Sequence, residues 1–267
     1  MTTGTAFPDH HRPNPARLYD ALLGGKDNYT ADREAMECMM SVAPHVRSAA
    51  LANRGFLEWT VRRLVTCGVT QFLDIGAGFP AGRNVHEIAQ DVRPDSRVVY
   101  VDNDPVVVRH GQALLTTGGS TMIEADLRHP TSIVENEELR RLLDLERPVA
   151  LLLFFVLDFV PHGDHPTAIV EQLLKAVAPG SYLAISHFVT DAGGHAAADA
   201  MTEAGIPVYP RTRAETHAMV GDLDVLLAGP LRPGSPHPGQ TAGLRSAGSR
   251  WRYGVLARKP QDAGAAG

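Results

Sequence analysis

Cysteines, aromatic residues and long apolar runs are all scarce in this chain of 267 residues. Its two cysteines, Cys38 and Cys67, are too few for a disulfide framework or a CxxC zinc site. Both have apolar neighbours at helical spacing, so we expect buried, unreactive thiols in a reducing, cytoplasmic setting. The 12 histidines form no HxxxH or HExxH pair, and we therefore expect no metal site.

Basic residues are not in excess either, because 25 Lys and Arg stand against 30 Asp and Glu, a formal net charge of −5. This balance argues against a general nucleic-acid binder, which carries a basic surface.

The longest apolar run, Val149–Leu157, is far shorter than the ~20 residues of a membrane-spanning helix. The first 15 residues lack the basic and apolar regions of a secretory signal. We expect neither nucleic acid nor a membrane among the partners.

Residues 1–66 are predicted to form an N-terminal helical extension. Asn14-Pro15 provides an N-cap and a first-turn proline for a helix that Gly24-Gly25 ends. A second helix is expected from Thr30. Apolar residues at helical spacing predict a third helix over Asn53–Gly68.

Short apolar strands alternate with amphipathic helices over residues 67–260. The predicted strands are Gln71–Asp74, Arg97–Asp102, Thr121–Ile123, Val149–Leu153, Ser181–Ser186, Val225–Leu227 and Trp251–Ala257. Helices are expected between them, one of them over Ser132–Leu143 and another over Ala192–Gly205. Such alternation is typical of an α/β fold, a parallel sheet covered by helices. The Gly- and Pro-rich segment Gly229–Gly248 is predicted to be a mobile loop, and residues 261–267 a disordered tail.

A glycine turn follows the first predicted strand. Asp74 stands two residues before Gly76 and four before Gly78, and glycines there let a ligand approach the backbone. The window Gly76–Ala81 also fits the loose G-x-G-x-x-G/A pattern of dinucleotide-binding proteins. A carboxylate at this place would repel a pyrophosphate and attract an ammonium group. S-adenosylmethionine has an amino-acid tail and no phosphate, so the electrostatics favour it.

Two further acids stand at the ends of the next two strands. Asp102 could accept both ribose hydroxyls, and Asp126 could accept a hydrogen bond from the adenine amino group, with Asn103 and Leu127 flanking the ring. Each acid alone could be a strand-end turn or a helix cap. Three acids at successive strand ends predict one shared pocket for a nucleoside-type cofactor.

These segments resemble a class I S-adenosylmethionine-dependent methyltransferase, in the order LDIGAG, YVDNDP, EADLR, LLLFFVLDFVP and VAPGSYLAISH. Four more segments extend the resemblance to a family of actinobacterial S-adenosyl methyltransferases long catalogued as a domain of unknown function: Arg17–Asn28, Ala52–Phe56, Gly82–Glu87 and Arg211–Glu215. The resemblance implies a Rossmann-like, doubly wound, mostly parallel seven-stranded sheet. Helices would cover both faces, and the last strand would be antiparallel.

The resemblance also implies roles for the acids. It maps Asp74, Gly76 and Gly78 to the amino-acid end of the cofactor, Asp102 and Asn103 to ribose and adenine, and Asp126 and Leu127 to adenine.

The helical extension would then lie over the pocket. We expect Lys26, Asp27, Asn28 and Tyr29 to form part of a lid, with Arg54 reaching the cofactor carboxylate. The alternative is that these four polar residues form a solvated turn after a helix end.

A general base is needed only if the acceptor must lose a proton. Asp158 and His187 are the candidates, because each follows a predicted strand on the ligand-binding side of the sheet. Either could instead be structural, Asp158 as a turn cap and His187 as a backbone-bonded side chain. The family would have a histidine at the place of Asp158, which leaves the role of that position open. Phe154 and Phe155 could face the sulfonium or pack in the core.

The sequence thus predicts a methyltransferase that uses S-adenosylmethionine and transfers the methyl group in line to an unidentified, small-molecule acceptor. The segment after the fourth strand lacks the Asn/Asp-Pro-Pro-aromatic turn of enzymes that methylate exocyclic amines of DNA. Two alternatives stay open, a non-catalytic protein that binds S-adenosylmethionine or S-adenosylhomocysteine, and a nicotinamide-dependent oxidoreductase, which Asp74 opposes. The acceptor and the oligomeric state are left open.

Overall fold

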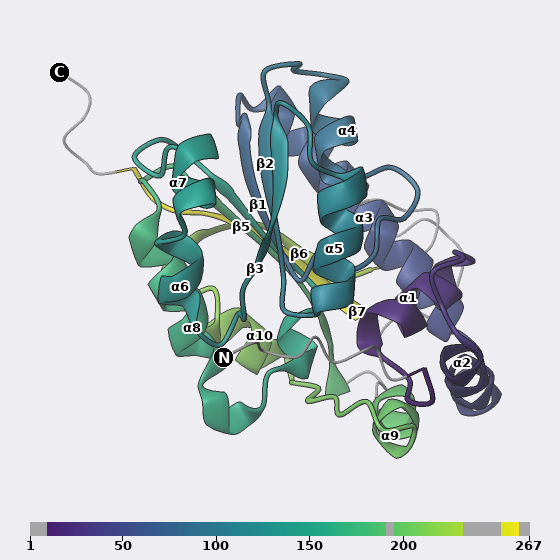
Figure 1. The fold of residues 1–267 in the computed structure, drawn as a ribbon. Coiled ribbons are helices and arrows are strands. Elements are labelled where there is room, and N and C mark those ends of the chain that lie inside the picture. Colours follow the sequence, from purple (N-terminus) through teal and green to yellow (C-terminus); the bar gives the residue numbers. More distant parts are fainter. Residues whose placement is uncertain (1–9, 191–194, 232–251, 262–267) are drawn as a thin grey trace, which may run out of the picture.

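A twisted seven-stranded sheet forms the centre of the protein, and the computed structural model describes residues 10–190, 195–231 and 252–261 (Figure 1). The strand order is β3-β2-β1-β4-β5-β7-β6. The strands are β1 Gln71–Ile75, β2 Arg97–Asp102, β3 Ser120–Glu124, β4 Ala150–Phe154, β5 Tyr182–Phe188, β6 Asp224–Pro230 and β7 Arg252–Arg258. Pairings among β1 to β5 are parallel, whereas β7 runs antiparallel to both β5 and β6. The predicted Rossmann-like sheet, with its antiparallel last strand, is confirmed.

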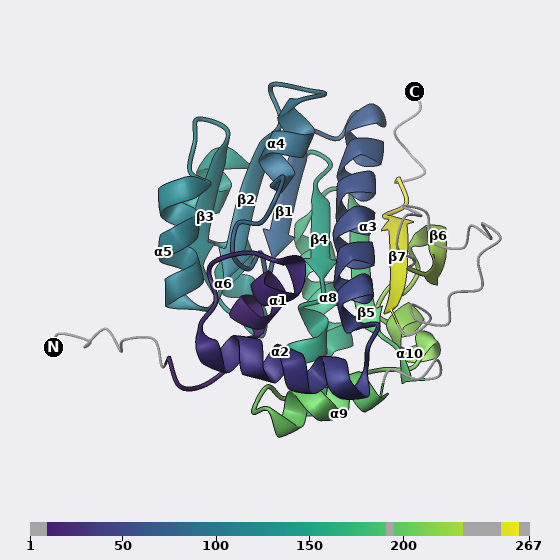
Figure 2. The same cartoon turned by 90° about the vertical axis from the view of Figure 1, so that its right-hand side faces the viewer.

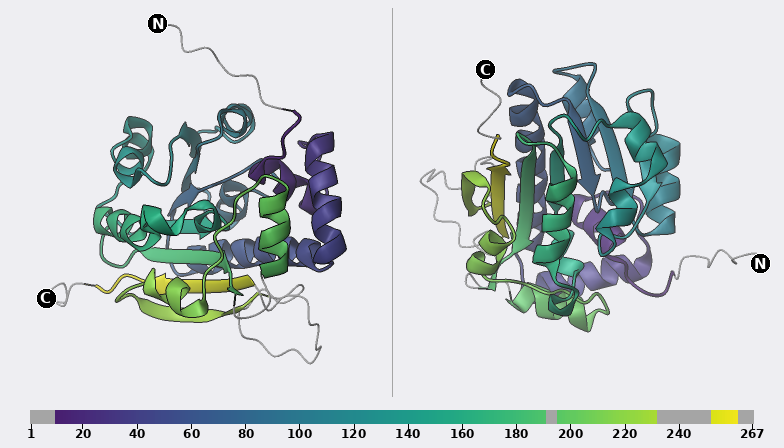
Figure 3. Two further views of the ribbon diagram at one scale, coloured as in Figure 1. Left: turned by 90° about the horizontal axis from the view of Figure 1, so that it is seen from below. Right: turned by 90° about the vertical axis from the view of Figure 1, so that its left-hand side faces the viewer.

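Helices cover both faces of this sheet (Figures 2 and 3). One face carries α3 Val46–Thr66, α4 Val85–Gln90 and α5 Pro105–Leu114, and the other carries α6 Pro130–Val134, α7 Glu137–Leu142 and α8 Pro166–Ala176. The helix α10, Arg213–Ala218, precedes β6, and two short 3-10 helices, η1 Leu157–Phe159 and η2 His162–Asp164, follow β4.

The strands read as continuous apolar runs because both of their faces are buried. Leu73 of β1 packs in the cluster that includes α8, while its neighbour Phe72 packs in the cluster that includes α3. Successive strand side chains point to opposite faces, so a strand between two helical layers needs apolar residues at every position.

Three further helices gather at the carboxyl end of the parallel strands: α1 Pro15–Leu23, α2 Thr30–Val42 and α9 His195–Glu203 (Figure 2). They share a third apolar cluster with Phe155 after β4 and Phe188 at the end of β5. Ligands of open parallel sheets bind at this edge, so the N-terminal extension lies over the functional end of the fold.

Two helix boundaries differ from the prediction. The third N-terminal helix begins at Val46 rather than Asn53, since Ala49 and Ala50 are fully buried and continue its apolar face. The single helix expected over Ser132–Leu143 is divided into α6 and α7. Asn136 interrupts it, because its side chain accepts hydrogen bonds from the first-turn amides of α7 and so acts as an N-cap.

The prediction of buried thiols is wrong, because Cys38 and Cys67 are both exposed. Cys38 lies on the outer side of α2, and Cys67 is the C-cap of α3. Part of the predicted loop over Gly229–Gly248 belongs to β6, and its remainder from residue 232, like residues 262–267, lies outside the described residues. Within the described part of the chain, no helix is long and apolar enough to cross a membrane.

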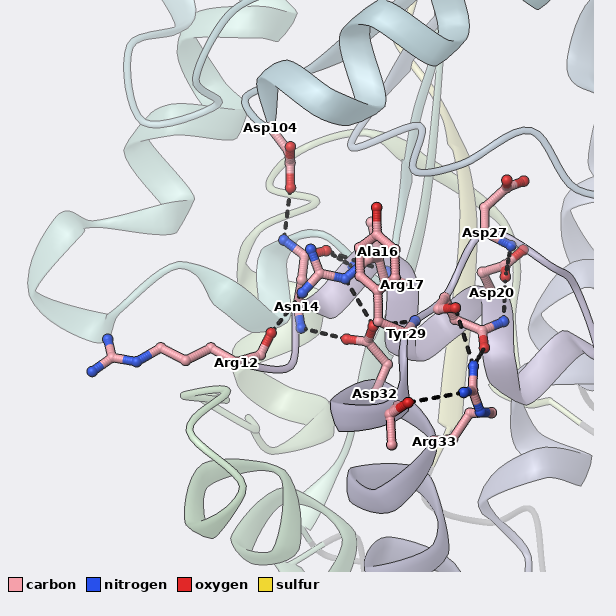
Figure 4. Close-up of polar contacts among 12 residues, drawn as sticks. Arg12, Asn14, Ala16, Arg17, Asp20, Asp27, Tyr29, Asp32, Arg33 and Asp104 are labelled. Carbon is pink, nitrogen blue, oxygen red and sulfur yellow. Dashed lines mark hydrogen bonds and ion pairs between the residues drawn. The ribbon is translucent and has the colours of Figure 1, made fainter. Parts of the chain in front are cut away.

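A buried ion pair joins α1 to α2 (Figure 4). Arg17 Nε donates to Asp32 Oδ2 at 2.8 Å, and both side chains are almost fully buried. The same carboxylate also accepts hydrogen bonds from the backbone amides of Asn14 and Tyr29. Asp32 therefore fixes where α1 begins and where α2 begins.

We predict that Arg17→Met destabilises the protein by about 3–5 kcal/mol, because it leaves the Asp32 carboxylate buried without its cationic partner. The matched control is Arg62→Met, which removes an exposed pair with Glu58 on α3 and should cost less than about 0.5 kcal/mol. Chemical denaturation of the two variants measures the difference. Equal losses of stability would show that the buried pair does not hold the extension.

Candidate functional site

A cavity of about 330 Å³ lies at the carboxyl ends of β1, β2 and β4, under α1 and beside α3. Residues at the ends of these strands and after β3 and β4 line it, together with residues of α1 and α3. Its volume is within the range of small-molecule sites. Asp74, Gly76, Gly78, Asp102, Asn103, Asp126, Leu127 and Arg54 are all among the lining residues. Eight residues singled out in the sequence are thus brought together.

The turn after β1 requires glycine. Gly76 has φ +74°, and a Cβ atom there would lie 2.4 Å from Val156 Cγ2. The amides of Gly76 and Ala77 both donate to the carbonyl oxygen of Val101, at 2.8 and 3.1 Å. A side chain at Gly76 would break this close approach between the turn and the segment after β4, so the position needs both the left-handed backbone and the absent Cβ.

Asp74 is the acid at the centre of this turn. Its side chain is buried and receives no hydrogen bond from the described residues. Burial raises the pKa of Asp74 to about 7, against the lowering influence of Arg54, and the nearby Asp102 raises it further. A buried carboxylate without a protein donor is a site for a cationic group, which would restore its ionised form.

Arg54 lines the cavity close enough to act on Asp74, and its guanidinium is fixed by backbone carbonyls. Its Nη2 donates to the carbonyl oxygens of Ala81, at 2.7 Å, and of Arg83. These bonds hold the loop after the glycine turn against α3. They leave the other guanidinium donors available to a carboxylate in the cavity.

Asp102 connects the ends of β1 and β2. One carboxylate oxygen accepts from Gly78 N at 2.9 Å, and the other from Asp104 N at 3.0 Å. Burial raises the pKa of Asp102, while these amide donors lower it. Each carboxylate oxygen can accept more than one hydrogen bond, so the group can still receive two hydroxyl donors from a ligand.

Asp126 is held in a different way, by a charged partner. Arg128 donates to both of its oxygens, at 2.6 to 3.1 Å, and lowers the pKa of Asp126 to about 2. Asn103 lies 3.5 Å from the same carboxylate, and Leu127 is buried beside it. A permanently ionised acceptor next to an apolar side chain suits the edge and the face of a flat, amino-bearing ring.

The sequence reasoning recognised Asn14 only as a helix cap, whereas its side chain also joins two helices (Figure 4). Asn14 Oδ1 caps α1 by accepting from Ala16 N and Arg17 N, and its Nδ2 donates to Asp104 Oδ2 at 2.7 Å. Asp104 is itself the N-cap of α5. Asn14, Ala16 and Asp104 all line the cavity, so this bond closes it on the α1 side.

A family model described as S-adenosyl methyltransferase matches residues 2–260 of the chain. The chain belongs to this family. A DUF574 family protein from Streptomyces avermitilis is 39% identical, with a TM-score of 0.87 over 94% of this chain and 99% of that chain. A candidate methyltransferase from Thermobifida fusca is 35% identical, with a TM-score of 0.86 over 96% and 100% of the two chains. No curated protein matches the sequence.

The family is one of S-adenosylmethionine-dependent methyltransferases, and the cavity fits that cofactor. The buried, donor-free carboxylate of Asp74 suits an ammonium group, and Arg54 beside it suits a carboxylate. The resemblance seen in the sequence is therefore confirmed for the family and the cofactor. The role of each site residue stays a prediction.

The turn expected to form the lid faces α1 instead of the cavity. Lys26, Asn28 and Tyr29 are not among the lining residues. Asn28 Nδ2 donates to Asp20 Oδ2 at 2.8 Å, and Asp27 N donates to the same oxygen at 2.9 Å. The buried Asp20 carboxylate thus draws the turn inward, while Lys26 stays exposed. The contact of the extension with the cavity comes from Asn14, α1 and α3.

Asp158 and His187 are also placed outside the cavity, and both are fully buried. Arg211 Nη1 lies 2.8 Å from His187 Nε2. Because a guanidinium only donates, Nε2 is the acceptor and the ring proton is on Nδ1, which contacts the Phe188 carbonyl at 2.8 Å and Asp158 Oδ1 at 3.0 Å. The lone pair that a base would use is therefore occupied. Burial also lowers the pKa of His187, and this geometry argues against a catalytic role for either residue.

We predict that Asp74→Asn stabilises the cofactor-free protein at pH 8 by up to about 4 kcal/mol. The pKa of Asp74 rises from 3.8 in the unfolded chain to about 7 in the fold, so the wild type loses stability as pH increases between these values. The gain should shrink toward zero by pH 4. Asp126→Asn is the control of opposite sign, because a pKa lowered to about 2 makes the ionised form stabilising at neutral pH. Denaturant midpoints at pH 4, 6 and 8 test both signs, and an effect of Asp74→Asn that does not change with pH would contradict this burial.

Proposed function

We propose that the protein transfers the methyl group of S-adenosylmethionine to a small molecule bound in the same cavity. The observation that carries the proposal is the meeting of Asp74, Asp102 and Asp126 in one cavity at neighbouring strand ends. Their environments differ. Asp74 receives no hydrogen bond from the described residues, Asp102 accepts from backbone amides, and Asp126 is paired with Arg128. This asymmetry matches the three polar parts of an adenosyl amino acid.

Each acid receives the group that its surroundings suit. Asp74 binds the ammonium, and Arg54 beside it binds the carboxylate of the amino-acid end. Asp102 accepts from the ribose hydroxyls. Asp126 accepts from the adenine amino group, with Asn103 and Leu127 against the ring.

When bound, S-adenosylmethionine supplies a methyl group activated by a sulfonium. The contribution of the chain is alignment and exclusion of water. Tyr19, Phe155, Phe159 and Val160 form an apolar wall of the cavity. The helix α1 covers the cavity and is anchored by the Asn14–Asp104 bond. A cavity enclosed in this way supports a small, partly apolar acceptor over a nucleic acid or a protein surface.

We predict that Asp74→Asn weakens S-adenosylmethionine binding by about 10- to 100-fold in calorimetry, since it removes the anion opposite the ammonium. In the wild type, affinity should fall toward tenfold per pH unit below pH 7, because the Asp74 carboxyl must lose a proton to bind a cation. The variant should lack this dependence. The control is Asp95→Asn, an exposed acid paired with Arg93 outside the cavity, which should bind as the wild type does.

NAD tested in the same experiment should give no heat of binding. Tight NAD binding without S-adenosylmethionine binding would contradict the proposal in favour of an oxidoreductase. Binding of S-adenosylmethionine without formation of S-adenosylhomocysteine over a broad set of small acceptors would favour the non-catalytic alternative.

A further inference from the structure

A buried arginine lies directly behind the apolar wall of the cavity. Arg252 of β7 is 1% exposed, and its Cζ is 3.7 Å from the ring centre of Phe155 and 4.3 Å from that of Phe188. Phe155 lines the cavity. A single aromatic side chain of the wall therefore stands in contact with a guanidinium.

The position of Phe155 is strongly determined. Its φ is +54°, an unfavourable value for a residue with a side chain. Its amide is held by Ser186, both by the hydroxyl at 3.0 Å and by the carbonyl at 3.2 Å. These hydrogen bonds hold the backbone of Phe155 in its unfavourable conformation, and in that conformation its ring lies against Arg252.

Two of the three guanidinium nitrogens of Arg252, Nε and Nη1, are buried without a hydrogen-bond partner among the described residues. The acidic groups that act on the guanidinium are the Tyr19 hydroxyl and Asp158, and Asp158 Oδ1 already accepts from Phe188 N and contacts His187. Asp158 Oδ2 is buried and also without a partner in the described part of the chain. Buried guanidinium groups are normally paired, because an unpaired one loses its hydration without replacement.

The buried group as a whole carries excess positive charge. Within it, Arg211 and Arg252 stand against the carboxylate of Asp158, and His187 is neutral because its Nε2 accepts from Arg211. The exposed Glu215 also acts on Arg211, whereas Arg252 is influenced by Tyr19 and Asp158. Even with Asp158 ionised, one positive charge remains. It lies in a region of low dielectric, where its field extends through the Phe155 ring into the cavity.

The cavity offers no general base to an acceptor on this side. Among the described lining residues, the acids are Asp74, Asp102, Asp104 and Asp126, all from the ends of β1 and β2 or the segment after β3. Asp102, Asp104 and Asp126 accept hydrogen bonds within the protein, and Asp74 is assigned to the ammonium. A protonated amine would find no group to remove its proton, and its methylated product would remain positive beside Arg252.

We propose that the methyl acceptor is an oxyanion, the carboxylate or ionised hydroxyl of a small molecule, and that Arg252 is the positioning residue whose charge selects it through Phe155. This inference rests on the proposed methyl transfer and names its acceptor class. An oxygen lone pair forms the new O–C bond while the C–S bond breaks with its electron pair left on sulfur. The products are a neutral ester or ether and a thioether, so no proton has to leave.

The test uses binding to the full-length protein saturated with S-adenosylhomocysteine. Calorimetry compares benzoate, benzamide and benzylamine, which share a ring and differ in charge. Benzoate should bind about tenfold or more tightly than benzamide, and benzylamine should bind most weakly. The pair 4-nitrophenolate and nitrobenzene tests the ionised hydroxyl in the same way and separates it from the carboxylate.

Two variants test whether Arg252 carries the preference. Arg252→Lys keeps the charge and should keep the preference for benzoate, whereas Arg252→Met should reduce it to within about twofold. A purely structural arginine would change the stability of the Met variant and leave the ratio of benzoate to benzamide affinity as it is. Arg62→Met, on the outer side of α3, is the control for loss of a positive charge.

The outcomes distinguish this inference from the proposed function. A wild type that does not bind S-adenosylhomocysteine contradicts the methyltransferase site itself. A wild type that binds it, yet binds benzoate no better than benzamide and nitrophenolate no better than nitrobenzene, overturns the oxyanion acceptor alone. This comparison needs only the wild type, so it decides the question even where a variant does not fold.

Discussion

The site depends on a carboxylate that the fold buries and leaves without a donor from the described residues. Asp74 ends a central strand, between β2 and β4, where burial raises its pKa to about 7. A protein selected for stability alone would not retain such a group, because an apolar residue or an amide would fit the same place at lower cost. Its presence is explained by a ligand with a positive charge. Gly76 after Asp74 is explained by the fold, since its positive φ and its close approach to Val156 leave no room for a Cβ atom.

The N-terminal extension is held in place by a few buried and half-buried hydrogen bonds around Asn14. The Asn14 side chain accepts a hydrogen bond from a first-turn amide of α1 and donates one to Asp104, the N-cap of α5. The Asn14 backbone amide donates to Asp32. One short side chain thereby links the extension to the second strand–helix unit of the sheet. Because Asn14 and Asp104 both line the cavity, helix capping and closure of the site are the same set of contacts. The extension is for this reason a part of the site and not an independent attachment.

The strands and the strand-end acids could be predicted because their signals are local. Apolar runs of the right length define β1 to β5. Asp74 is the penultimate residue of β1, Asp102 is the last residue of β2, and Asp126 comes two residues after β3. What failed depended on contacts between distant segments. Asn28 turns toward Asp20, and His187 gives its lone pair to Arg211, and neither partner can be read from spacing. The exposed face of α2 misled the prediction for Cys38, because apolar neighbours in sequence do not show which side of a helix is covered. Arg252 lies next to a segment without any motif, and only the sheet order brings it behind Phe155.

Two buried groups of opposite charge therefore border one cavity, Asp74 near the end of β1 and Arg252 behind the ring of Phe155. Each alone would be a cost to the folded state. Arg252 adds a positive charge behind Phe155, in addition to Arg54, which lies beside Asp74. A pair of ligands with its cation beside Asp74 and its anion beside Phe155 would lower the energy of both Asp74 and Arg252. Methyl transfer from a sulfonium to an oxyanion joins such a pair and removes one charge of each sign, so the field that aligns the reactants does not hold the neutral product in place.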